Sequence, residues 1–204
     1  MHTIGILAYG SLVEDPGVEL EKKIIGRIEE VETPFLVEFA RSSRTRDGAP
    51  TLIPVTMGGC RVRAVILILN PEVSVESAMD LLWRRETRKG DRTIRYQART
   101  DPGPNHVVVE HLSNFSGLKT VLYTSIGANI PKNTPECLAR LAIESAKGNA
   151  GATKMDGINY LLSVKRHGVK TPLLPAYEVK ILELSKADSL EKAFEKIRSK
   201  NANS

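Results

Sequence analysis

The sequence has few cysteines and no long apolar segment. Its 204 residues include only Cys60 and Cys137, which are far apart and too few for a disulfide framework. No apolar run approaches the roughly 20 residues that a transmembrane helix needs. We also expect no secretory signal, because the N-terminus lacks a basic region followed by an apolar one. These absences predict a cytoplasmic protein without membrane contact.

The motifs of several common enzyme classes are missing as well. The chain has no G-x-x-x-x-G-K-[ST] motif, and no G-x-G-x-x-G follows Tyr9, which argues against phosphate-binding loops and dinucleotide sites. The four histidines lack the spacing of metal ligands, so we expect no metal site. Ser11 does not lie in a G-x-S-x-G motif, which argues against a nucleophilic serine.

Positive charge is in excess and unevenly placed. Lys and Arg outnumber Asp and Glu by 29 to 24, and arginines cluster at 41–46 and 84–99. Such charge permits binding to nucleic acid or to small acidic molecules, and a solvated basic face is the structural alternative. Neither interleaved aromatic residues nor a recognisable nucleic-acid motif accompanies the clusters, so we expect no nucleic-acid partner.

Hydrophobic patterning predicts strands early in the chain and helices late. The expected strands are 3–8, 35–40, 51–57, 62–69, 107–112, 118–124 and 177–184. The expected helices are 74–87, 134–147, 155–167 and 188–199, with caps at Ser74, Thr134 and Asp156. The segments 87–106 and 125–133 are expected loops. We therefore expect an α+β fold and a single domain over residues 1–200.

The expected helix at 74–87 carries a carboxylate at the end of an apolar stripe. The stripe follows the i, i+3, i+4, i+7 spacing of a buried helix face, with Val75, Ala78, Met79 and Leu82. Glu86 is the next position of that stripe, where an unpaired buried carboxylate would be costly. Two interpretations are open: Glu86 binds a nearby arginine at the helix end, or it acts as a general base.

Two segments together resemble the γ-glutamylcyclotransferase family. Tyr9-Gly10-Ser11-Leu12, after an N-terminal strand, is similar to the family's Y-G-S-[LN] signature. Arg84-Arg85-Glu86 resembles the family's R-E segment, whose glutamate is the catalytic acid/base. Residues 39–48 are similar to a stretch of the ChaC-type branch, which degrades glutathione. The resemblance covers residues 3–125 well and the C-terminal helices loosely.

The resemblance implies a mixed, β-barrel-like sheet flanked by helices. It also implies release of 5-oxoproline, without a cofactor, from a γ-glutamyl compound: glutathione, a γ-glutamyl amino acid or a γ-glutamyl amine. The substrate's α-amine would attack its own γ-carbonyl, with Glu86 as general acid/base. The alternatives are a catalytically silent protein of this fold that binds a small acid and, less favoured, a nucleic-acid-binding module.

The family resemblance gives the strand-end segment a role in binding the acidic substrate. Gly10 would let the backbone approach a ligand closely. The amides of Gly10, Ser11, Leu12 and Val13 would bind the γ-glutamyl carboxylate or a developing oxyanion, and Tyr9 would line the pocket. The structural alternative is a strand that ends in a plain turn. Neither the leaving group nor the oligomeric state follows from the sequence.

Overall fold

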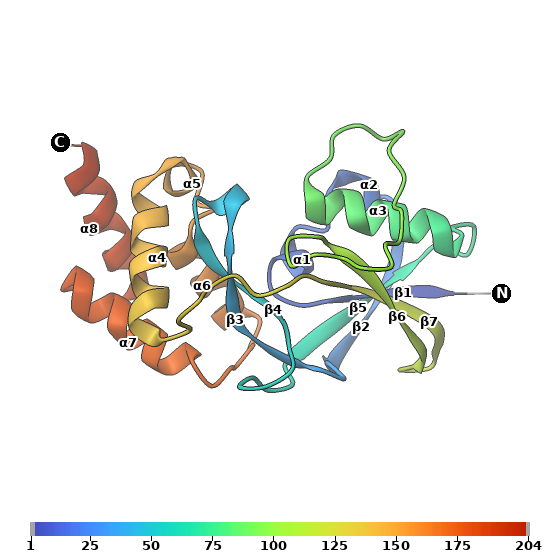
Figure 1. Ribbon diagram of the computed structural model, residues 1–204, viewed down its shortest axis with the longest axis horizontal. Helices are drawn as coiled ribbons and strands as arrows, with labels where there is room; N and C mark the ends of the chain where they lie inside the picture. Colours follow the sequence, from blue (N-terminus) through green and yellow to red (C-terminus); the bar gives the residue numbers. More distant parts are fainter. Residues whose placement is uncertain (1–2, 203–204) are drawn as a thin grey trace. The chain divides into compact units, whose positions relative to one another are not determined.

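A computed structural model describes residues 3–202 and contains a five-stranded mixed sheet (Figure 1). The strand order is β2-β5-β1-β7-β6, with β1 antiparallel to β5 and parallel to β7. The strands are β1 (Ile4–Ala8), β2 (Ile24–Glu32), β5 (Arg63–Leu69), β6 (Val108–Phe115) and β7 (Leu118–Ser125). The expected α+β class, with a mixed sheet and helices, is confirmed.

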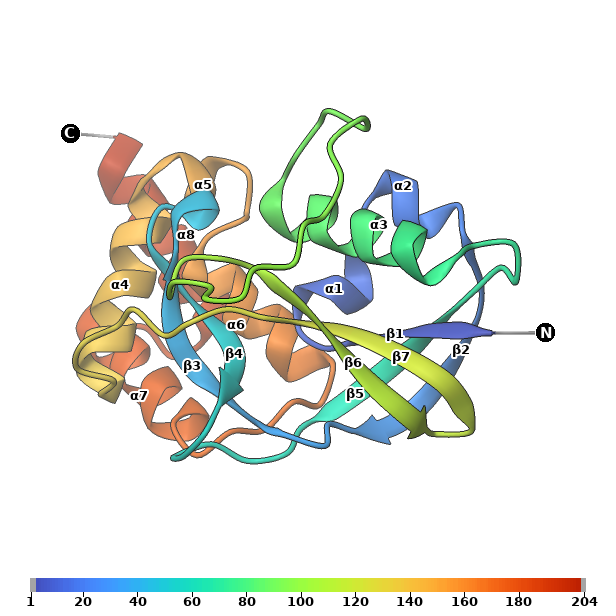
Figure 2. The ribbon, with the colours of Figure 1, turned by 45° about the vertical axis from the view of Figure 1, so that its right-hand side comes forward.

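Helix α3 (Val75–Thr87) covers one face of this sheet. It contacts β1, β6 and β7, and both ribbon views show it lying across them (Figures 1 and 2). Ala78 and Leu82 of the expected apolar stripe are fully buried, in one cluster with Ile6 of β1. Two short helices, α1 (Ser11–Glu14) and α2 (Val18–Glu21), link β1 to β2. This core fixes the end of α3 relative to the segment that follows β1.

The remaining elements form a second packed group. β3 (Leu36–Ser43) and β4 (Ala49–Val55) pair as a two-stranded antiparallel sheet, joined by a 3₁₀ turn, η1 (Arg44–Arg46). The helices are α4 (Pro135–Lys147), α5 (Asn149–Ala152), α6 (Gly157–Arg166), α7 (Leu174–Ser185) and α8 (Leu190–Ala202). Within residues 3–202, every helix is too short or too polar to cross a membrane.

Residue contacts divide the chain into two units, each compact in itself. Unit 1 consists of the residues up to Thr33 together with Arg63–Gly127, and unit 2 of Pro34–Val62 together with the residues from Ala128 onwards. The chain therefore passes between the units three times. The single domain expected over residues 1–200 stays a prediction, because compactness does not test whether a unit folds independently.

The expected helix caps are confirmed by their hydrogen bonds. Ser74 Oγ accepts from the Ser77 amide over 3.2 Å. Thr134 Oγ1 accepts from the Cys137 amide over 3.3 Å. Asp156 accepts from two amides in the first turn of α6. In each case a short polar side chain satisfies an amide that has no intrahelical partner.

One assignment from the sequence is wrong, and one strand was missed. The segment 177–184, expected as a strand, lies within helix α7, which begins at Leu174 and has Pro175 in its first turn. Its buried residues Tyr177 and Ile181 are one helical turn apart, whereas Val179 between them is 53% exposed. Strand β2 was not expected, because it is rich in charge and interrupted by two irregularities in its pairing with β5. It is an edge strand, where exposed charged side chains are common.

Candidate functional site

Arg85 joins the two segments that resemble the family. Its Nη1 donates to Glu86 Oε1 over 2.5 Å, and its Nη2 lies 3.5 Å from Ser11 Oγ. Its Nε and Nη2 also donate to the Asp15 backbone carbonyl, over 2.9 and 2.5 Å. One guanidinium thus connects the end of α3 to both ends of α1. Glu86 and Ser11, 75 positions apart in the sequence numbering, contact the same side chain.

The chain turns sharply where β1 meets α1, and a glycine makes this turn. Gly10 has φ 57° and ψ −134°, a conformation that a residue with a Cβ adopts only with strain. A helical turn follows, rather than a plain turn, and it buries the side chains of Leu12 and Val13 in the core. These two residues can therefore meet a ligand only through their backbone.

The amides of this segment are partly engaged within the chain. The Val13 amide donates to the Gly10 carbonyl over 3.3 Å. The amides of Ser11 and Leu12 lie at the start of α1, where a helix offers them no intrahelical acceptor. Anion binding by the amides of Gly10, Ser11 and Leu12 stays a prediction. Tyr9, the expected pocket-lining residue, is half-buried.

Glu86 lies in the last turn of α3, and its side chain is 25% exposed. The contact with a neighbouring arginine, one of the two interpretations from the sequence, is present through Oε1. Oε2 has no hydrogen-bond partner among the described residues, so it can accept a proton from a bound ligand. Its role as a general base stays a prediction.

The stem of Arg85 is held by close packing against a glycine. The Arg85 side chain is only 10% exposed, and a Cβ on Gly17 would lie 3.1 Å from its Cγ. Gly17 also has a positive φ of 80°. A larger residue here would strain the backbone and press on Arg85, so Gly17 helps to fix the position of the guanidinium.

Two buried charges on α3 were not recognised from the sequence. Arg84, 7% exposed, donates to Glu19 Oε2 over 2.8 Å and to the Ile94 carbonyl over 3.1 Å. Asp80 accepts from Arg95 Nη1 over 2.7 Å and from the Tyr96 amide over 2.6 Å. These contacts fasten the irregular segment after α3 to the helix. The available signal was an acid and a base at i and i+4 on the expected helix, Asp80 and Arg84.

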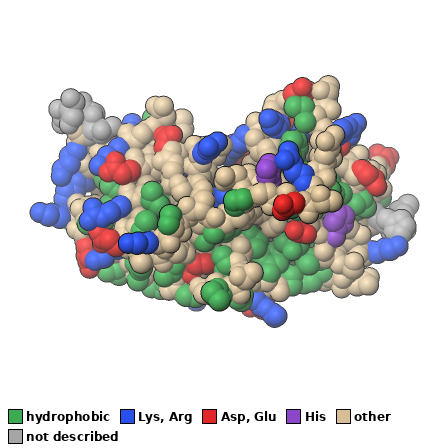
Figure 3. Space-filling view, in the orientation of Figure 1, with side chains coloured by type: hydrophobic (Ala, Val, Ile, Leu, Met, Phe, Trp, Pro, Cys, Tyr) green, Lys and Arg blue, Asp and Glu red, His purple; other side chains and the backbone are tan. Residues whose placement is uncertain are grey.

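A small pocket lies next to Arg85. It has a volume of about 260 Å³ and is lined by residues of 15–20 and 81–92, whereas Glu86 and residues 9–13 are not among its lining residues. On the face shown in Figure 3, Lys and Arg side chains lie around α3 and the segment that follows it. The basic cluster expected at 84–99 therefore contributes several cations to this one pocket.

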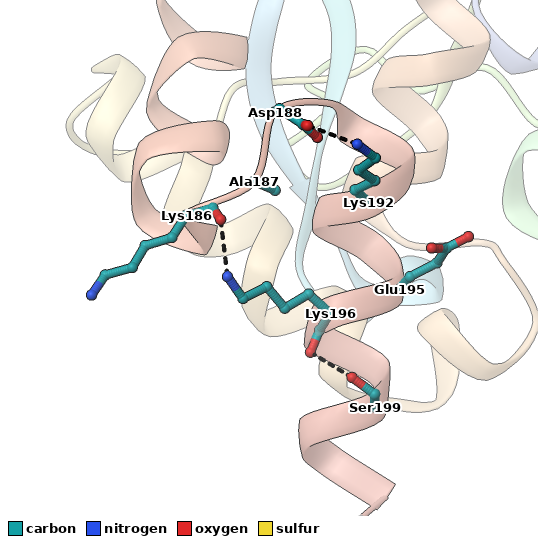
Figure 4. A pocket seen from close by; sticks show the side chains of 7 residues that line it. All are labelled: Lys186, Ala187, Asp188, Lys192, Glu195, Lys196 and Ser199. Atoms are coloured by element: carbon teal, nitrogen blue, oxygen red, sulfur yellow. Dashed lines mark hydrogen bonds and ion pairs between the residues drawn. The ribbon is translucent and has the colours of Figure 1, made fainter.

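A larger surface pocket, of about 720 Å³, lies along α8 in unit 2. Two of its three lysines are already bonded within the chain: Lys192 points to Asp188 over 2.7 Å, and Lys196 reaches the Lys186 carbonyl over 2.9 Å (Figure 4). These contacts stabilise the last helix and engage most of the positive charge that lines this pocket.

Metal-binding geometry and known proteins give no further assignment. Among residues 3–202, no group of three or more His, Cys, Asp or Glu side chains is placed to hold a metal ion. The chain matches none of the models of known protein families, and a search of curated proteins finds no similar sequence. The functional interpretation therefore depends on the residues around Arg85 and Glu86.

Proposed function

We propose that this chain is a γ-glutamylcyclotransferase with a fold of that family's type, and that Glu86 is its general acid/base. One observation supports the proposal above all. The Arg85 guanidinium contacts both Glu86 and Ser11, so the two family-like segments lie next to each other in unit 1. A chance match of two short motifs would not require them to share a side chain.

The reaction needs one group that moves a proton. The substrate's α-ammonium must lose a proton before the amine attacks the γ-carbonyl carbon. A new C–N bond then closes the five-membered ring of 5-oxoproline, and the attacking nitrogen loses a second proton. The original C–N amide bond breaks, and the departing amine takes up both protons and leaves as an ammonium ion. A single carboxylate can accept these protons in turn and pass them to the departing amine. Because the ring closes within one molecule, positioning supplies much of the rate.

The residues near Glu86 suit this chemistry. Arg85 holds Oε1 and leaves Oε2 free to take the proton. The Ser11 hydroxyl and the first amides of α1 can donate hydrogen bonds to the substrate's carboxylate or to the oxyanion that forms on its γ-carbonyl. The Gly10 turn carries no side chain that would keep a substrate from these amides. A small, acidic γ-glutamyl compound is the substrate class that fits.

The test is release of 5-oxoproline, measured by mass spectrometry, from a panel of γ-glutamyl compounds that includes glutathione. Glu86→Gln keeps the size of the side chain and should lower turnover by about 10²–10⁴-fold. Glu72→Gln, at an exposed position before α3, is the matched control and should behave as wild type. Wild-type turnover in Glu86→Gln would refute the assignment of Glu86. The best substrate would identify the leaving group.

The Arg85–Glu86 contact also supports a second candidate, a silent protein of the same fold that binds a small acid. The ion pair with Arg85 can also serve only to hold the end of α3 in place, so the contact suits a structural role of Glu86 as well. No release from any compound, together with saturable binding of a γ-glutamyl amino acid, would select this candidate. Binding to nucleic acid that weakens steeply with salt, without turnover, would favour the nucleic-acid module instead.

A further inference from the structure

The pocket next to Arg85 concentrates positive charge. Five basic side chains line it: Arg84, Arg85, Arg88, Lys89 and Arg92. Only two carboxylates, Asp15 and Glu19, line the same pocket. The lining therefore carries three positive charges in excess within about 260 Å³. Cations held this close repel one another, and a bound anion would relieve that repulsion.

The two carboxylates are shared among these cations. Glu19 binds Arg84 through Oε2, while Arg92 Nε lies 3.9 Å from its Oε1. Asp15 Oδ2 is 3.8 Å from Arg88 and 4.0 Å from Arg85, distances at the limit of an ion pair. Lys89 has no acidic partner among the described residues. Arg85 is in addition paired with Glu86, which lies outside the lining. Even so, the five cations meet only three carboxylates, and their charge is only partly compensated by the protein itself.

Arg84 supplies a second, independent observation. It is 7% exposed, and its two terminal nitrogens bind Glu19 and the Ile94 carbonyl. Its Nε is buried and has no hydrogen-bond partner among the described residues. An unsatisfied buried donor costs free energy, and the residue that carries it is one of those that line the pocket.

We propose that this pocket binds a small anion with two or more negative charges, of the phosphate or dicarboxylate class. Guanidinium groups form paired hydrogen bonds to both phosphate and carboxylate oxygens. The volume is below the range usual for drug-sized ligands, so it suits a head group rather than a whole nucleotide. The site goes beyond the proposed function, because neither Glu86 nor residues 9–13 line it.

The experiment is isothermal titration calorimetry of the full chain at low salt, with pyrophosphate and malonate as separate probes. We expect saturable binding with one site per chain for at least one probe, and the stronger probe distinguishes phosphate from dicarboxylate. The double variant Arg88→Gln/Lys89→Gln should weaken binding by about tenfold or more. The control Arg61→Gln/Arg99→Gln changes net charge equally at exposed positions outside the pocket, and should weaken it by less than about twofold.

A variant that binds the anion more tightly than wild type tests the proposal independently of misfolding, because a misfolded protein would not gain affinity. Asp15→Asn removes the side-chain charge that competes for Arg85 and Arg88, while its backbone carbonyl still holds Arg85. This variant should bind the anion about threefold more tightly or better. Absence of saturable binding in the wild type, equal losses in both double variants, or weaker binding by Asp15→Asn would each overturn the proposal. None of these readouts depends on turnover, so the proposed activity can fail without affecting this result.

Discussion

Asp80 and Arg84 lie one helical turn apart on α3, and each binds the segment that follows the helix. Asp80 contacts Arg95 and the Tyr96 amide, while Arg84 contacts the Ile94 carbonyl. The ring of Tyr96 then lies 6.2 Å from that of Trp83, centroid to centroid. A stretch without regular structure is therefore attached to the helix at three consecutive residues, next to the proposed anion pocket.

Loss of the Asp80 carboxylate should release this segment. In Asp80→Ala, the Tyr96 amide and the Arg95 guanidinium lose their acceptor, and we expect the free energy of unfolding to fall by about 1–3 kcal/mol. Limited trypsin digestion should become faster at Arg92, Arg95 and Arg99. Asp101→Ala, an exposed change in the same segment, is the control. Unchanged cleavage in Asp80→Ala would show that other contacts hold the segment.

The variant Arg85→Lys should show whether the proposed activity needs only a positive charge at this position or also the planar guanidinium group. A lysine keeps the positive charge but cannot reach Glu86, Ser11 and the Asp15 carbonyl together, because it lacks the planar fork of donors. If the proposed activity is present, 5-oxoproline release should fall by about tenfold or more. Arg99→Lys makes the same change at an exposed position and should have no effect. Equal turnover in both variants would mean that positive charge alone suffices next to Glu86.

The buried hydroxyl of Tyr177 gives a prediction about stability. Tyr177 is fully buried, and its hydroxyl has no hydrogen-bond partner among the described residues. Tyr177→Phe removes this unsatisfied group, so the variant should be as stable as wild type or more stable, by up to about 2 kcal/mol. Tyr160→Phe is the contrasting control. Its hydroxyl accepts from the Leu52 amide over 3.2 Å, so its removal should destabilise. Urea unfolding at neutral pH measures both.

The same residue predicts how stability changes in alkali. Burial, and then the charge of Asp156, raises the pKa of Tyr177 far above its usual value of about 10. The unfolded chain therefore loses this proton above about pH 10 while the folded chain keeps it. The wild type should lose about 1.4 kcal/mol per pH unit there from Tyr177, and Tyr177→Phe should not. A difference between the two proteins that stays constant from pH 9 to 11 would contradict this.

Local sequence patterns were sufficient to predict secondary structure where one hydrophobic periodicity or one capping residue determines it. The stripe of Ala78 and Leu82 and the cap at Asp156 depend on neighbouring residues alone, and both are confirmed. The expected strand at 177–184 failed because Tyr177, Val179 and Ile181 fit an alternating pattern in composition. Only their burial shows which period the fold uses. Patterns of this length do not separate a strand from a buried helix.

The site was accessible to sequence reasoning only in part. The two motifs could be recognised, but nothing in the amino-acid sequence indicated that the Arg85 side chain would contact both Glu86 and Ser11. The pocket depends on contacts of Asp15 and Glu19 with arginines at the end of α3 and just after it, which lie far away in the sequence. A count of basic residues at 84–99 shows the charge, but not which carboxylates neutralise part of it.

The order of the strands in unit 1 affects how the chain can fold. β1 is central, yet its parallel partner β7 begins only at Leu118, after the chain has passed through Pro34–Val62 of unit 2. During synthesis, β1 cannot pair with either neighbouring strand until residues 34–62 have been made, because β5 also comes after them. Contacts between such distant segments slow folding, because the entropy of closing the intervening loop is lost before the contacts form. Neither unit can be obtained by a single truncation: a chain cut after Gly127 would keep β3 and β4 but lose every helix of the unit to which they belong.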